Sequence, residues 1–216
     1  MSQTDNAIIE RAVDSWMADD IDVHEETENY HKGTVRKIVF IIVLIVIAII
    51  AAGFAMSAFT SQNYGARKFS RIREGLHVCL AIATVSYLIL GSIMIFFPTY
   101  LAKIMVTGTE PIRIAGTYLP ICGIFLFAVD FLFVFRNGCQ GFGKPLVPMI
   151  SGIAEMALRI GVIALFINVI GFRATAYAEA SAWIGALILN MASFEHTLNK
   201  SLGTSAISHK KLRTAA

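Results

Sequence analysis

The stretch that decides the fold reads Ile38-Val39-Phe40-Ile41-Ile42-Val43-Leu44-Ile45-Val46-Ile47-Ala48-Ile49-Ile50, and mostly apolar residues continue from it to Thr60. In a soluble protein, such a β-branched run would be typical of a buried strand. Its length and its lack of turn residues instead predict a helix that crosses a membrane, for which about 20 mostly apolar residues are needed. We therefore predict a first transmembrane helix over residues 38–60.

Four more segments of this kind follow the first one. They cover about residues 76–97, 112–135, 146–170 and 175–198. Only helices or closed barrels satisfy the backbone in lipid, and continuous apolar runs differ from the alternating pattern of barrel strands. The sequence thus predicts an all-α, multi-spanning membrane protein with about five transmembrane helices.

Composition excludes most other classes of protein. Of the 216 residues, 56% are hydrophobic and 15% are charged, whereas soluble domains carry roughly 25% charged residues. Cys79, Cys122 and Cys139 are too few for a disulfide scaffold, and their spacing is not that of a metal site. Because all three lie in or at the ends of apolar segments, we expect them to pack as small hydrophobic residues.

Charge divides the chain into three regions. Residues 1–35 form an acidic polar tail with nine acidic and two basic residues. Residues 36–199 hold the predicted helical bundle, and residues 200–216 form a basic C-terminal tail. The bases lie beside apolar runs, so they indicate orientation in a membrane, and we expect no nucleic-acid partner.

The charges between the spans predict the orientation. Segment 62–75 holds four basic residues against one acidic residue, and connection 136–144 and the C-terminal tail add further bases. Since cytoplasmic loops are rich in Lys and Arg, we expect these three segments in the cytoplasm of a multi-pass protein of the cell membrane. With five spans the acidic tail then lies outside, although Arg36 and Lys37 argue against that placement.

Asp130 is an acidic residue inside the third predicted span, among apolar and aromatic neighbours. A charge near the centre of a bilayer is costly, so such a residue normally faces the protein interior and marks the path of an ion or substrate. Asp130 is therefore a candidate for a group that couples the movement of a cation or proton to transport. The alternative is a structural ion pair between Asp130 and Arg136.

Glu155 and Arg159 form a second candidate group. Their four-residue spacing places both side chains on one face of a helix, where they can form an ion pair. Pairing lowers the cost of holding each charge in the membrane, which favours a structural role over contact with substrate. Glu179 and Glu195 lie near the two ends of the last span and are expected to be solvated at the membrane surfaces.

Small residues mark the expected places of close helix packing. The run Gly138-Cys139-Gln140-Gly141-Phe142-Gly143-Lys144 lacks the spacing of a phosphate-binding loop, and no strand precedes it. We interpret its glycines as positions where helix ends approach each other. Ala178, Ala182 and Ala186 recur every four residues, as in helices that pack closely in lipid. The sequence contains no catalytic triad and no metal-binding motif, so we expect no enzyme.

Three segments resemble one known family. Gln62-Asn63-Tyr64-Gly65-Ala66-Arg67-Lys68 is similar to the "Gln-Asn-x-Gly-Ala-x-Lys" helix end and loop of multidrug and toxic compound extrusion (MATE) transporters. Gln140-Gly141-Phe142-Gly143 resembles their "Gln-Gly-x-Gly" cytoplasmic loop. Glu155-Met156-Ala157-Leu158-Arg159 and Ala182-Trp183-Ile184-Gly185-Ala186 are similar to the closing helices of the family's C-terminal half. The resemblance covers about residues 53–196, and its loop motifs include Gln62, Gly65, Gln140 and Gly141.

The resemblance implies a fold and a function. MATE members have twelve helices in two six-helix lobes, and the five predicted spans correspond to most of the second lobe; residues 1–50 show no likeness. The implied activity is alternating-access export of cationic or amphiphilic organic compounds, such as drugs and toxins, against Na⁺ or H⁺ and without a further cofactor.

One lobe holds only half of such a transporter's cavity. The resemblance therefore implies a homodimer, or a separate chain that supplies the first lobe, surrounded by membrane lipid. The alternative is a membrane fragment that does not transport, either inert or acting as a regulatory subunit.

Overall fold

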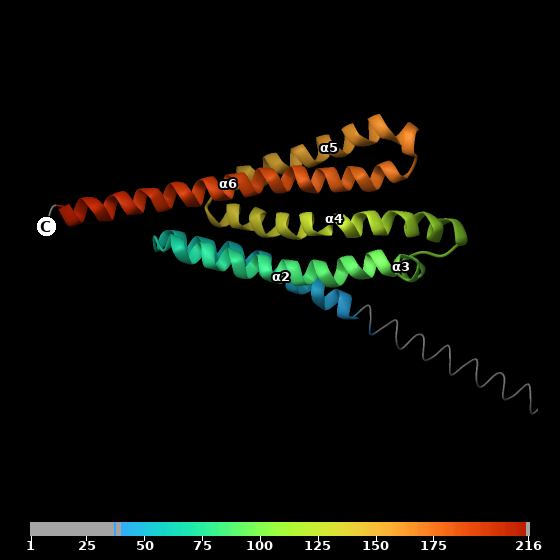
Figure 1. Ribbon diagram of the computed structural model, residues 1–216, viewed down its shortest axis with the longest axis horizontal. Helices are drawn as coiled ribbons and strands as arrows, with labels where there is room; N and C mark the ends of the chain where they lie inside the picture. The colour runs from blue at the N-terminus through green and yellow to red at the C-terminus, as the bar shows by residue number, and fades with distance from the viewer. Residues whose placement is uncertain (1–36, 38–39, 215–216) are drawn as a thin grey trace, which may run out of the picture. The chain divides into compact units, whose positions relative to one another are not determined.

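The computed structural model describes residue 37 and residues 40–214, with side chains described as far as residue 204 (Figure 1). Predictions for the acidic tail 1–35 lie outside these residues. The described part is helical and has no strand, which confirms the predicted all-α class.

Six helices make up the described part of the chain. They are Phe40–Gly65, α2 (Phe69–Phe96), α3 (Pro98–Met105), α4 (Thr109–Gly141), α5 (Leu146–Ile170) and α6 (Arg173–Thr214). The chain divides into two units at residue 45, and the helices are packed together in the unit Ile45–Ala216. For the first helix, the contacts given below are those of residues 45–65.

Four of the described helices are long and apolar enough to cross a membrane, namely Phe40–Gly65, α2, α4 and α5. They cover nearly all of the first four predicted spans, and α5 has the predicted bounds. The fifth predicted span, 175–198, is continuous helix within α6, but α6 is not among the four. Its glutamates, Asn190 and many alanines make it less apolar than the others, so this fifth crossing stays a prediction.

The connections between helices are shorter than predicted. Segment 62–75 is mostly helical, because the first helix runs to Gly65 and α2 begins at Phe69, which leaves residues 66–68 as the turn. Similarly, α4 continues to Gly141, beyond the predicted end at residue 135. Lys and Arg near a helix end can extend their heads to water while the backbone stays helical. The apolar pattern therefore marks the end of the membrane span and not the end of the helix.

The short helix α3 was not predicted. Pro98 ends α2, as expected, but it also occupies the first turn of α3. Proline is favoured there because the missing N–H would have no partner inside the helix. The chain thus continues in a new helix of eight residues before α4.

The helix α4 lies at the centre of the bundle. It packs against α2 and α3 on one side and against α6 on the other, while α5 packs mainly against α6 (Figure 1). The buried core between these helices includes Ile72, Leu76, Val134, Phe135, Cys139, Phe194 and Leu198. All three cysteines are buried and free, which confirms that they pack as small hydrophobic residues.

Glycines and alanines permit the closest helix contacts. A Cβ on Gly138 would lie 2.5 Å from the Phe194 ring of α6, and a Cβ on Gly141 would lie 2.5 Å from the Ser57 carbonyl oxygen of the first helix. The predicted alanine stripe on α6 is fully buried as well. The expectation that these small residues let helices approach each other is therefore confirmed.

We expect Gly141→Ala to destabilise the protein by about 1–3 kcal/mol, because the new methyl group would press on a backbone oxygen that cannot move aside easily. Gly152→Ala is the matched control, since a Cβ there meets nothing within 4 Å. In a helix this replacement should stabilise by roughly 0.5–1 kcal/mol. Thermal unfolding of the purified variants in detergent measures both effects. Equal unfolding temperatures for the two variants would contradict the close contact at Gly141.

Candidate functional site

Asp130 is buried in the interior of the bundle. It lies in the second half of α4, and only 5% of its surface is exposed. Its Oδ2 atom has no hydrogen-bond partner among the residues that the structure describes. A buried carboxylate oxygen without a partner is costly, which makes it a candidate to hold a proton or a cation.

The alternative role for Asp130, an ion pair with Arg136, is wrong. The two residues are six positions apart on one helix, so their side chains point about 120° apart around its axis. The Arg136 guanidinium instead donates hydrogen bonds to the carboxylate of Glu155 and to Ser151 Oγ, the latter over 3.3 Å. Both partners belong to α5.

A second buried oxygen without a hydrogen-bond partner belongs to Ser86 of α2, near the level of Asp130 of α4. Ser86 is 5% exposed, and its Oγ has no partner in the described part of the chain. The register of α2 and α4 follows from the rings of Tyr87 and Phe127, whose centroids are 5.9 Å apart, and from Gly91, which meets Gly123 farther along. The two helices are therefore antiparallel, and Asp130 lies within one turn of the level of Ser86.

Sequence reasoning did not single out Ser86. A serine inside an apolar span carries no charge and belongs to no motif. The available signal was its position on the buried face of α2, three residues after Ala83 and seven after Cys79. That spacing indicates burial but not a function.

Glu155 and Arg159 form the predicted ion pair, with 3.7 Å between Arg159 Nη2 and Glu155 Oε2. The pair belongs to a longer series. Glu155 also binds Arg136 of α4, and Arg159 also binds Glu179 of α6 over 2.9 Å. We call Arg136, Glu155, Arg159 and Glu179 the charge ladder; its four side chains are 11–35% exposed.

The expectation that Glu179 is simply solvated is wrong, because it is a member of the charge ladder. The close packing of α5 against α6 places its carboxylate beside Arg159. Glu195 also has a partner, since it lies 3.5 Å from Arg73 of α2. Both glutamates therefore connect helices.

The loop motifs meet at one end of the bundle. Gln62 and Gly65 lie in the last turn of the first helix, and the Ala66 N–H donates to the Gln62 carbonyl over 3.1 Å. Gln140 accepts a backbone hydrogen bond from Gly143, and Gly141 is buried. The Tyr64 and Phe142 rings, 5.1 Å apart, join the two motifs.

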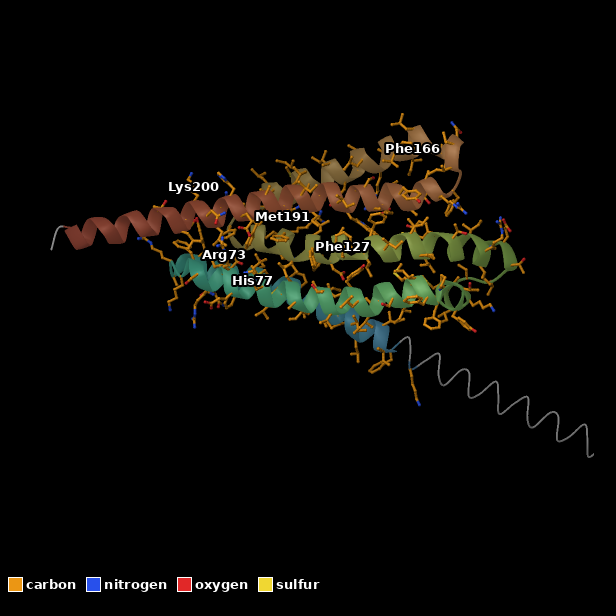
Figure 2. The ribbon with its side chains drawn as sticks, viewed as in Figure 1. Arg73, His77, Phe127, Phe166, Met191 and Lys200 are labelled. Carbon is orange, nitrogen blue, oxygen red and sulfur yellow. The ribbon has the colours of Figure 1, made fainter. Side chains whose placement is uncertain are left out.

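Basic residues gather at the same end. Arg73 and Lys200 both lie there, whereas Phe166 lies toward the opposite end of α5 (Figure 2). Lys144 donates to Thr197 Oγ1 over 2.7 Å, and Arg73 donates to Asn199 over 2.7 Å. The motifs therefore shape and connect helix ends, and Asp130 lies apart from them in the interior.

The family model MatE matches residues 20–169 of the chain. The match begins earlier than the likeness noted above, so the interpretation that residues 1–50 do not resemble the family is wrong from residue 20 onward. Within that part, the Ile and Val run of residues 38–50 carries little residue-specific signal. The match ends before α6.

Solved structures show the same fold. An inward-facing multidrug resistance MATE family transporter of the MOP superfamily is 19% identical, with a TM-score of 0.60, over 70% of this chain and 36% of that chain. A MATE protein in the bent conformation gives the same identity and TM-score, over 34% of its own length. A MOP superfamily transporter from Pyrococcus furiosus, for which a reverse polarity of the binding pocket suggests a different function, gives a TM-score of 0.59.

The chain spans about a third of the length of these structures. No curated protein matches its sequence. At 19% identity the structural likeness concerns the fold alone.

Proposed function

We propose that this chain, which belongs to the MatE family, forms one lobe of a secondary transporter. The transported compounds are cationic or amphiphilic organic molecules, exported against Na⁺ or H⁺. Transporters of this general kind bind substrate near the bilayer midplane between structural repeats, and they alternate access by moving one repeat against the other.

The observation that carries this proposal is the buried, unpartnered carboxylate of Asp130. Every other acidic side chain described here either has a basic partner or is exposed. An unpaired buried acid in a membrane protein is a group that can take up and release a cation or proton. Such a group is what coupling to a gradient requires.

Reconstitution into vesicles tests the proposal. Vesicles containing the protein are loaded with a fluorescent organic cation, and a Na⁺ or H⁺ gradient is imposed across their membrane. We expect dye movement that depends on one of the two gradients and exceeds that of protein-free vesicles. Movement that exceeds the protein-free rate but ignores both gradients would contradict coupled transport, and movement at the protein-free rate would favour the fragment that does not transport.

The proposed assembly is a homodimer or a complex with a chain that supplies the other lobe. Large apolar side chains are exposed along α5 and along the first helix, including Phe54, Leu146, Ile153 and Ile160. Lipid covers apolar side chains well, but a transport path between lobes needs protein on both sides. We expect chemical crosslinking in native membranes to trap a dimer or a heteromer. A monomer alone, in membranes and in mild detergent, would contradict the assembly.

We also propose that the end of the bundle with residues 66–68 faces the cytoplasm, since it carries most of the bases. A cysteine introduced as Ser70→Cys, in a background without native cysteines, should react with an impermeant thiol reagent only after the cells are opened. Thr107→Cys, an exposed position between α3 and α4, is the matched control and should react in intact cells. The reverse pattern of labelling would overturn this orientation.

A further inference from the structure

The charge ladder joins three helices. Arg136 lies on α4, Glu155 and Arg159 lie on α5, and Glu179 lies on α6. Each charge is next to a charge of opposite sign, and the Glu155 carboxylate is shared between the two arginines. The ladder holds two positive and two negative charges, so it is neutral as a whole.

The helix α5 has little other buried surface. Its only buried residues in the described structure are Ser151 and Glu155, and both bind Arg136. Its contact with α6 includes Leu158, whose side chain fills the space beside Gly185. Most of its remaining side chains are exposed and apolar, so in lipid they do not favour one position of α5 over another.

We propose that the charge ladder holds α5 in one fixed position against α4 and α6, so that these three helices form one rigid unit. In lipid, no hydrophobic driving force holds helices together, whereas a buried charge without its partner is costly. Sliding or rotating α5 would separate at least one of the two ion pairs that join it to other helices, Arg136–Glu155 and Arg159–Glu179. This role depends on attraction between neighbours and not on which member is acidic, which distinguishes it from binding a substrate or an ion.

The position of α5 is measured with a disulfide. Leu158→Cys and Gly185→Cys place two thiols where the leucine side chain now meets the glycine, in a chain whose three native cysteines are replaced by alanine. Membranes are treated with a mild oxidant, and a maleimide of high mass then reports by gel shift how many thiols are still free. The rate of disulfide formation reports how often α5 lies in the position against α6 that the structure shows.

Two kinds of ladder variant are compared in this background. Arg159→Glu leaves three carboxylates with one guanidinium and should slow disulfide formation by about tenfold or more. The second variant inverts the whole ladder, with Arg136→Glu, Glu155→Arg, Arg159→Glu and Glu179→Arg, and keeps every pair attractive. We expect this inversion to restore the original rate. Arg113→Glu is the control, because Arg113 and its partner Glu110 are exposed.

The outcomes distinguish a role of the charge ladder in holding α5 in position from a role in binding a substrate or an ion. An unchanged rate in Arg159→Glu and also in the neutral Arg159→Gln would overturn the proposal. If Arg159→Glu is not produced in membranes, Arg159→Gln and the inverted ladder still test it. The proposal would also be overturned if the inverted ladder is present in the membrane but does not recover the original rate of disulfide formation. That result would assign the ladder a role that depends on the sign of its charges. None of these measurements requires transport activity.

Discussion

Asp130→Asn is expected to abolish gradient-driven transport while leaving the amount of protein in the membrane unchanged. The amide has nearly the same size and polarity as the carboxyl group, but it cannot release a proton or carry a negative charge. Because Asp130 Oδ2 has no partner among the described residues, no ion pair is lost with its charge. The measurement is dye flux per amount of reconstituted protein under an imposed Na⁺ or H⁺ gradient.

Two controls show whether the charge itself matters. Asp130→Glu keeps an ionisable group and should retain part of the flux. Arg136→Gln should not rescue Asp130→Asn, because Arg136 binds Glu155 and not Asp130. Flux at the wild-type level in Asp130→Asn would exclude Asp130 as the coupling group. Rescue by Arg136→Gln would support an ion pair between Asp130 and Arg136 in the wild-type protein, which the structure contradicts.

Glu155→Ala is expected to lower the free energy of unfolding by about 3–5 kcal/mol, the usual cost of removing one partner of a buried ion pair. The loss is large because Glu155 faces two arginines, Arg136 and Arg159, and only Glu179 would then balance them. Unfolding by heat or denaturant in detergent gives the measurement.

Glu110→Ala is the matched control for this loss. Glu110 also binds an arginine on a helix, but both side chains are mostly exposed, and exposed pairs contribute little to stability. We therefore expect little change in unfolding temperature for this variant. Similar losses for Glu110→Ala and Glu155→Ala would mean that burial of the ladder does not determine its contribution.

The fold class followed from hydropathy, because a run of about 20 apolar residues has few stable alternatives to a membrane helix. The bounds of α5 were predicted because Pro145 and Gly171 flank its apolar run directly. The bounds of α2 and α4 were not, because basic residues at their ends stay helical outside the apolar region. Hydropathy measures the surroundings of a segment, whereas backbone hydrogen bonds determine its conformation.

The candidate site was predictable only where neighbours lie close in sequence. The four-residue spacing of Glu155 and Arg159 revealed their pair, as any helix would place them together. The partners Arg136 and Glu179 lie on other helices, and their contacts depend on how α5 is rotated. Ser86 gave no chemical signal at all. Contacts between helices require the packed structure, because each helix alone permits many rotations.

The short turn between α5 and α6 has a consequence for how the protein is made. Only residues 171–172 separate the two helices, and Gly171 has a φ of 60°, which glycine adopts readily. If α6 crosses the membrane as predicted, a turn this short lets the two helices enter it as a hairpin. Arg159 and Glu179, 20 residues apart in sequence, pair within that hairpin. An unpaired arginine opposes insertion by about 2.5–3.5 kcal/mol at the centre of a helix. Arg159 has Glu155 as a partner within α5 and gains Glu179 when the hairpin forms, so we expect insertion of α5 to be helped by α6.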